Sequence, residues 1–287
     1  MSAPPATPTQ LTAPNLTLEA AGGTTYAYRR FGNTGCAVPP VLFLQHFRGN
    51  LDNWDPALVD AVAAEREVVL LDNAGVGGSS GTTPRTVAAM AHDALAFADA
   101  AGLRQVDVLG FSLGGFVAQE LTLVRPRLVR RLVLAGTGPE GGQGMHGFTA
   151  EVHASATRDE PTGEDLLHLF FERTPSSVAK GWEFVERIFA RDADRDQPVS
   201  LATRDAQLDA ITAWGVPDPV RLNRLAGITQ PVLVANGDND VMVPTPNSGL
   251  LARHLPNARL SIYPGAGHGF LFQYPAEFAA EVNGFLG

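Results

Sequence analysis

Residues 106–115 read VDVLGFSLGG, and this stretch decides the fold. An apolar run of strand length leads into Ser112, and a helical pattern at 113–123 follows it. Glycine lies two positions to either side of the serine. A nucleophile that stands clear of a sheet needs such a tight turn, and N–H groups at the start of the next helix face the reacting oxygen. The stretch predicts that Ser112 is a catalytic nucleophile, with the N–H of Leu113 as one donor to the oxyanion.

The alternation of strand and helix extends over much of the chain. Continuous apolar runs, typical of strands buried on both faces, occur at 41–44, 67–71, 106–109, 132–135, 231–235 and 260–263. Helical patterns separate the earlier runs at 56–64, 86–101 and 113–123. Strands that alternate with helices of this length form right-handed βαβ units. We therefore predict an α/β fold, with a mostly parallel central sheet flanked by helices.

One long segment interrupts this alternation. Residues 138–225 lack strand-like runs, and loop signals rich in glycine and proline mark both of their ends. Helix-like stretches within the segment occur around 163–173, 177–191 and 201–214. We expect a helical cap at 138–225, inserted into a core made of residues 16–137 and 226–287.

The composition narrows the class of protein. A chain of 287 residues with 45% hydrophobic and 18% charged residues is globular, and a net charge of −9 argues against a nucleic-acid partner. The apolar runs are shorter than the roughly 18 residues of a membrane span, so no membrane partner is expected. Cys36 is the only cysteine, which excludes an intramolecular disulfide and fits a cytoplasmic protein. Residues 1–15 have no signal-peptide pattern and are expected to form a flexible tail.

A serine hydroxyl is a poor nucleophile unless a base takes its proton and an acid orients that base. After a serine in this setting, the acid and then the histidine follow in chain order. The segment 236–240, NGDND, comes directly after a predicted strand and offers Asp238 and Asp240 as the acid. His268 follows the last predicted strand, whereas five of the other histidines fall in helical patterns, in the cap or at a helix end, namely His92, His146, His153, His168 and His254. We predict that His268 is the base.

With these motifs the chain resembles the α/β-hydrolase superfamily over about residues 16–287. It is most similar to the branch of capped esterases, lactonases and cofactor-free haloperoxidase-like enzymes, or perhydrolases. The resemblance implies that Asp240, the second aspartate of GDND, is the acid and that Asp238 caps the turn. A triad of Ser112, Asp240 and His268 is therefore expected.

One loop departs from the pattern of that family. Residues 45–50, QHFRGN, resemble its H-G-x segment, which implies that the N–H of Phe47 is the second oxyanion donor. Gln45 and His46 stand where the family usually has histidine and glycine, so a side chain replaces a permissive glycine beside the site. His46 either packs and hydrogen-bonds locally or contacts the substrate.

The function expected from these residues is that of a cofactor-free serine hydrolase that cleaves a carboxylic ester or lactone through an acyl-enzyme. Aromatic side chains are numerous in the expected cap, which favours a small-molecule substrate with a hydrophobic body. No metal-binding, phosphate-loop or dinucleotide motif is present, so neither a metal nor a cofactor is expected. Perhydrolase chemistry and amide or C–C bond hydrolysis stay open. So do a cofactor-independent oxygenase and a ligand receptor on the same fold.

Overall fold

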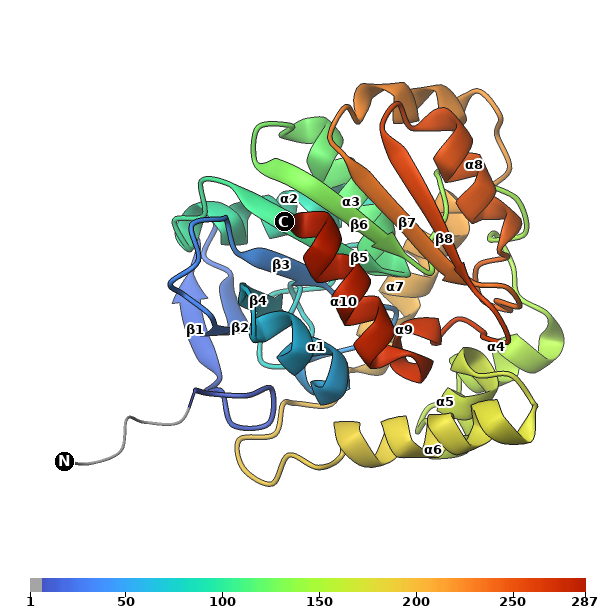
Figure 1. The fold of residues 1–287 in the computed structure, drawn as a ribbon, viewed down its shortest axis with the longest axis horizontal. Helices are drawn as coiled ribbons and strands as arrows, with labels where there is room; N and C mark the ends of the chain where they lie inside the picture. The colour runs from blue at the N-terminus through green and yellow to red at the C-terminus, as the bar shows by residue number, and fades with distance from the viewer. Residues whose placement is uncertain (1–6) are drawn as a thin grey trace.

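The computed structural model describes residues 7–287, and an eight-stranded sheet runs through them (Figure 1). Its strands are β1 (Leu16–Glu19), β2 (Thr25–Gly32), β3 (Val41–Leu44), β4 (Glu67–Leu71), β5 (Val106–Phe111), β6 (Val129–Ala135), β7 (Val232–Gly237) and β8 (Ala258–Tyr263). They lie in the order β1-β2-β4-β3-β5-β6-β7-β8. β2 pairs antiparallel with β1 and β4, and all other neighbours pair parallel. The predicted α/β fold with a mostly parallel sheet is confirmed.

Helices cover both faces of this sheet. Figure 1 shows α1 (Pro56–Ala63) and α10 (Pro275–Leu286) packed together in front of it, with α2 (Val87–Ala100) and α3 (Leu113–Val124) behind it. The other helical elements outside the segment between β6 and β7 are α8 (Pro246–His254), α9 (Phe270–Gln273) and the 3₁₀ turn η1 (Leu51–Asn53). β3, β5 and β7 are buried along their whole length, which explains why their sequences are continuous apolar runs. None of the helices in residues 7–287 is long and apolar enough to cross a membrane.

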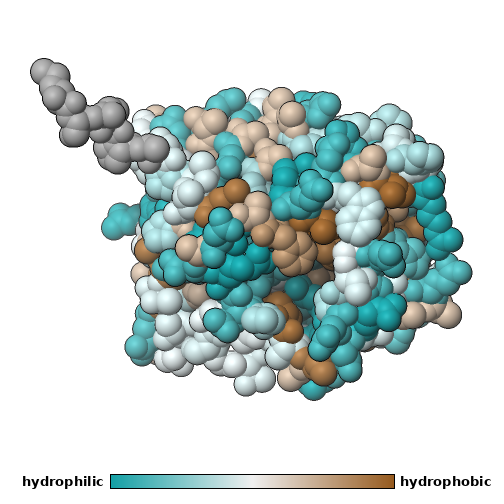
Figure 2. Space-filling model, turned by 90° about the horizontal axis from the view of Figure 1, so that it is seen from below, coloured by the Kyte–Doolittle hydropathy of each residue, from teal (hydrophilic) through white to brown (hydrophobic). Residues whose placement is uncertain are grey.

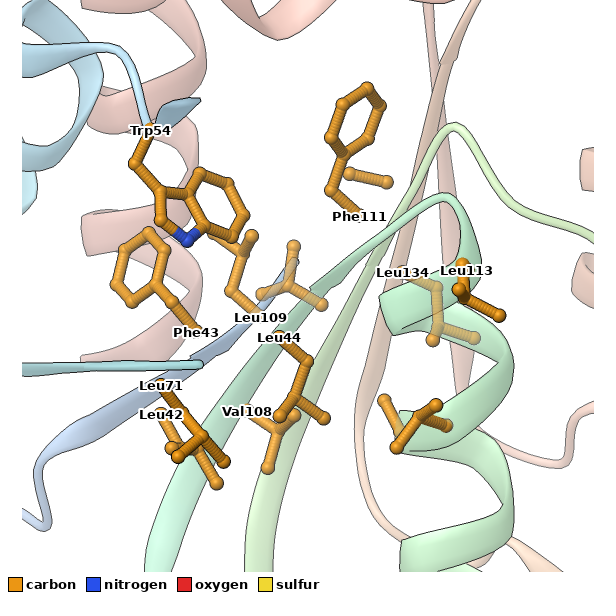
Figure 3. Close-up of a cluster of buried hydrophobic side chains, with 14 of the residues drawn as sticks. Leu42, Phe43, Leu44, Trp54, Leu71, Val108, Leu109, Phe111, Leu113 and Leu134 are labelled. Atoms are coloured by element: carbon orange, nitrogen blue, oxygen red, sulfur yellow. The ribbon is translucent and has the colours of Figure 1, made fainter. Parts of the chain in front are cut away.

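Aliphatic and aromatic side chains fill the core beside the central strands (Figure 3). Leu44 of β3 and Val108 and Leu109 of β5 are fully buried, as are Phe43 and Trp54. The rings of Phe43 and Trp54 meet edge to face with their centroids 5.1 Å apart. Each buried side chain of this size stabilises the fold by about 1.5–3 kcal/mol. This packing fixes the carboxyl ends of β3 and β5, from which the loops of the candidate site depart.

The chain between β6 and β7 forms what we call the helical insert, the segment that contains four helices and the 3₁₀ turn η2. These elements are α4 (Ala150–Ala156), α5 (Gly163–Phe170), α6 (Pro175–Ile188), α7 (Leu201–Trp214) and η2 (Arg221–Gly227). Each of the four helices starts after a hydroxyl side chain that accepts a backbone N–H of the first turn, namely Thr149, Thr162, Thr174 or Ser200. The sequence pattern predicts α5, α6 and α7 and misses α4. Figure 1 shows α5 and α6 along the lower edge of the sheet.

The amino-terminal segment differs from its prediction as a flexible tail over 1–15, of which residues 1–6 lie outside the described residues. Gln10 is buried, and its side-chain amide donates to the carbonyl of Leu51 at 2.6 Å. The buried guanidinium of Arg191 donates to the carbonyls of Gln10 and Ala13 at 3.1 and 2.9 Å. The prediction is therefore wrong for residues 10–13, because partners distant in sequence hold this part of the chain on the core.

Candidate active site

Ser112 lies at the junction of β5 and α3 with a φ of 55° and a ψ of −119°. Such a conformation costs a non-glycine residue about 1–3 kcal/mol and is kept where surrounding structure enforces it. A Cβ on Gly110 would lie 2.4 Å from the carbonyl oxygen of Gly114. A Cβ on Gly114 would lie 1.9 Å from the carbonyl oxygen of Leu44. Both flanking glycines are therefore required by close backbone contacts, as the tight-turn interpretation demands.

Asp240 and His268 form a buried pair on loops that follow β7 and β8. His268 donates from Nδ1 to Oδ2 of Asp240 at 2.7 Å. The other carboxylate oxygen of Asp240 accepts the backbone N–H groups of Met242 and Val243 at 2.7 and 2.8 Å. These three hydrogen bonds fix both carboxylate oxygens, and in the neutral imidazole with its proton on Nδ1, Nε2 is a proton acceptor.

Asp238, the other candidate acid, has a different environment. Its side chain is exposed, and its Oδ1 accepts the N–H of Ala266 at 3.1 Å. It also accepts from the amide of Asn239 at 3.2 Å. Asp238 therefore bridges two loops, and of the two aspartates Asp240 is the one that contacts the histidine ring.

Ser112 and His268 line the same cavity. The ring of His268 is tilted against that of Phe111, with a centroid distance of 4.9 Å. On another side it lies against Gly136, whose φ is 53° and where a Cβ would come within 3.3 Å of the ring. Among residues 7–287 no hydrogen bond joins the Ser112 hydroxyl to the imidazole. Both side chains therefore face the same cavity, and Phe111 and Gly136 pack against the imidazole.

The cavity lies between the carboxyl edge of the sheet and the helical insert. Apolar side chains of the insert, Leu166, Leu169 and Phe170, form much of its wall. Phe189, at the end of α6, also lines it and is 56% exposed, so it stands at the rim. Figure 2 shows the side of the molecule formed by α5 and α6, where hydrophobic side chains gather near the middle of a largely polar face. A ligand in this cavity would meet an apolar surface on the side of the insert.

The two backbone N–H groups predicted as oxyanion donors belong to segments that touch. Leu113 is the first residue of α3, so its N–H has no acceptor within the helix. The N–H of Phe47 likewise has no acceptor among the described residues. The backbone contact between Gly114 and Leu44 holds the start of α3 against the end of β3. Two donors without partners therefore lie on adjoining backbone segments beside Ser112.

His46 lies in the wall of the cavity with its ring edge-on to Phe111 and Phe170, at centroid distances of 5.3 and 5.2 Å. Its Nδ1 donates to the carbonyl of Phe47 at 2.8 Å. Burial lowers the pKa of the ring to about 4, so the imidazole is neutral near pH 7. Nε2 is buried and has no partner within residues 7–287. The local packing and hydrogen bonding expected of His46 are therefore present, and the contact with substrate stays a prediction.

Gln45 explains how the loop tolerates this departure from the family pattern. Its Oε1 accepts the N–H of His46 at 2.9 Å, and its Nε2 donates to the carbonyl of Asn50 at 2.9 Å. The buried amide thus bonds to both ends of the loop. A side chain that both accepts and donates replaces the histidine that the family usually has here.

Comparison with known proteins identifies the family to which this fold belongs. The family model that matches the chain is that of the alpha/beta hydrolase fold, over residues 39–275. The chain belongs to the α/β-hydrolase fold family. A solved alpha/beta hydrolase fold protein from Chitinophaga pinensis is 43% identical, with a TM-score of 0.90 over 97% of this chain and 99% of that one.

Curated relatives of this α/β-hydrolase carry several names. One from Azorhizobium caulinodans, named "Putative carbamate hydrolase RutD", is 29% identical over 257 residues, which are 88% of this chain and 92% of the relative. One from Mycobacterium tuberculosis, named "Putative non-heme bromoperoxidase BpoC", is 29% identical over 243 residues, which are 82% of this chain and 89% of the relative. The resemblance to the α/β-hydrolase superfamily inferred from the motifs is confirmed, and a relative with a haloperoxidase-like name is among the proteins similar to this chain.

Two residues of this α/β-hydrolase that the motifs do not mark hold the loop after β3. Arg48 has a φ of 60°, and its N–H donates to Oε1 of Gln207 on α7 at 2.7 Å. Its guanidinium donates to the carbonyls of Ala156, Arg158 and Asp159 at 3.2, 2.6 and 3.1 Å. No local pattern predicts these contacts, because their partners lie more than 100 positions away in the chain.

Proposed function

We propose that this α/β-hydrolase is a cofactor-free serine hydrolase that cleaves a carboxylic ester or lactone with a hydrophobic body. One observation carries the proposal. His268, hydrogen-bonded to the buried Asp240, lines the same cavity as Ser112, and Ser112 is held in a strained turn. A buried carboxylate and a strained nucleophile turn are both costly, and such features are typical of catalytic sites.

In the proposed reaction, Oγ of Ser112 attacks the carbonyl carbon while Nε2 of His268 takes the hydroxyl proton. Asp240 holds the imidazole in the required tautomer. The N–H groups of Leu113 and Phe47 donate to the oxyanion of the tetrahedral intermediate. The same histidine then returns its proton to the leaving oxygen, and water hydrolyses the acyl-enzyme by the reverse sequence of steps.

The helical insert supports the preference for a hydrophobic substrate. We propose that residues 138–225 act as a cap over Ser112, with Leu166, Leu169 and Phe170 against the acyl or alcohol part of the substrate. Apolar walls with a few convergent polar groups are typical of small-molecule sites. His46, whose ring lies beside Phe170 in the wall of the same cavity, would contact the substrate through its unpartnered Nε2.

A second candidate is transfer of the acyl group to hydrogen peroxide, which is favoured by the relative named as a bromoperoxidase. In that reaction peroxide replaces water in the second step, and a peracid leaves Ser112. Formation of peracid from an ester and hydrogen peroxide, measured by oxidation of a halide, distinguishes this activity from simple hydrolysis.

The experiment that tests the proposal is a panel of p-nitrophenyl esters of increasing acyl length, several lactones and a carbamate ester, the last prompted by the relative named as a carbamate hydrolase. We expect turnover of at least one ester class, with a preference for apolar acyl groups, and its loss in Ser112→Ala. Turnover in Ser112→Ala at the wild-type rate would contradict the assignment. Oxygen consumption would point instead to an oxygenase, and a single stoichiometric turnover would point to a ligand receptor.

A further inference from the structure

The loop that carries the oxyanion donor of Phe47 is a four-residue turn. The N–H of Gly49 donates to the carbonyl of His46 at 3.0 Å, which closes the turn. Arg48, the third residue, has a φ of 60°, whereas Phe47 is not among the described residues with positive φ. These signs define a type II turn, which favours glycine at its third position. Arginine there is strained, so other contacts must hold the turn in this form.

The middle peptide of the turn is held from two sides. Its carbonyl, that of Phe47, accepts from Nδ1 of His46 at 2.8 Å. Its N–H, that of Arg48, donates to Oε1 of Gln207 at 2.7 Å. Rotation of this peptide toward the less strained type I turn would break both hydrogen bonds. The histidine belongs to the loop itself, whereas Gln207 belongs to α7 of the helical insert.

We propose that Gln207 is a positioning residue for the oxyanion hole, so that the helical insert completes the hole as well as covering the substrate. This inference rests on the proposed function. Gln207 is 1% exposed, and its carbonyl oxygen holds the peptide that immediately follows the donor N–H of Phe47. Donors in an oxyanion hole are effective because they are already oriented before the reaction begins. Loss of one such donor lowers kcat by about 10²- to 10³-fold. A donor that is loosened rather than removed loses part of that factor.

The arginine strengthens the same connection. The guanidinium of Arg48 donates to the carbonyl of the last residue of α4 and to two carbonyls in the loop before α5, so the turn is bound to the insert through both backbone and side chain. A shift of α7 away from the sheet would therefore release the turn. The position of the helical insert therefore determines whether the N–H of Phe47 is oriented toward the oxyanion.

The test compares Gln207→Met, which keeps the length of the side chain but removes the acceptor, with Gln207→Glu, which keeps an acceptor oxygen. The probe is an alkyl fluorophosphonate, because its reaction requires no knowledge of the natural substrate. Oγ of Ser112 forms a bond to phosphorus, the P–F bond breaks, fluoride leaves, and the proton passes to His268. The rate of adduct formation is followed by intact mass, beside kcat and KM for an ester that the wild type turns over.

We expect Gln207→Met to form the adduct roughly tenfold more slowly or worse, with a lower kcat and little change in KM. We expect Gln207→Glu to recover most of the rate. Labelling of Gln207→Met at the wild-type rate would overturn the inference. Equal slowing in both variants with equal losses of thermal stability would also overturn it, because packing alone would then explain the residue. Failure of the wild type to label at Ser112 would instead refute the proposed function.

A measurement on the wild-type protein tests the same contact if Gln207→Met does not fold. Amide hydrogen exchange resolved at residues 45–50 should show slow exchange at Arg48, although it lies in a turn, because its N–H is bonded to a buried acceptor. Fast exchange at Arg48 would overturn the inference.

Discussion

Replacement of Asp240 by asparagine removes one charge and, through the geometry of this site, fixes the wrong tautomer of His268. Oδ1 of Asp240 accepts two backbone N–H groups, so the oxygen of an asparagine would keep that position. The amide nitrogen would then face Nδ1 of His268, which is 2.7 Å from Oδ2 in the wild type. Two donors cannot share that contact. The imidazole would have to carry its proton on Nε2 and could no longer accept one from Ser112.

The expected loss is about 10⁴-fold in kcat, or about 5.4 kcal/mol of transition-state stabilisation, the size seen when a triad histidine is held in the wrong tautomer. The assay is the hydrolysis of the best p-nitrophenyl ester from the panel, with thermal unfolding as a check on the fold. Nitrogen NMR of labelled histidine reports which ring nitrogen carries the proton.

Asp238→Asn is the matched control, two residues away. Its side chain is exposed and its contacts are with a backbone N–H and an amide, so we expect its kcat to stay within about threefold of the wild type. A folded Asp240→Asn variant with a rate within tenfold of the wild type would refute the reasoning. So would a loss in Asp238→Asn as large as that in Asp240→Asn.

Two further predictions concern stability. Burial lowers the pKa of His46 to about 4, so the unfolded chain, with a pKa near 6.5, binds this proton first as the pH falls. Stability from the neutral ring is present above about pH 6.5 and is lost toward pH 4, by up to roughly 3 kcal/mol. The free energies of unfolding of wild type and His46→Asn, measured by denaturant titration, should therefore converge by that amount between these pH values. A difference that stays constant with pH would contradict this. Asp107 on β5 is fully buried between Arg66 and Arg130, so Asp107→Ala should lower the free energy of unfolding by about 3–5 kcal/mol, because it leaves the buried guanidinium of Arg66 without its anion. A loss below about 1 kcal/mol in denaturant unfolding would show that water reaches this pair.

Local sequence determines much of the framework of the candidate site. The glycines around Ser112 are dictated by backbone contacts within a few residues and against the neighbouring strand, so the motif alone indicates the turn. The largely apolar sequences of β3, β5 and β7 predict a sheet covered on both faces, since strands buried on both faces carry few polar residues. The chain order of Asp240 and His268 follows from their places after late strands.

Tertiary structure decides what depends on contacts between distant segments. It distinguishes Asp240 from Asp238 by the direction in which each carboxylate points. The sequence near residue 10 resembles a loose tail, and only packing against Leu51 and Arg191 gives it a fixed position. The hydrogen bond between Arg48 and Gln207 joins residues 159 positions apart, and no local periodicity predicts such a contact. A motif reflects constraints within one turn or one strand, whereas the direction of a buried side chain is set by whatever the fold brings against it.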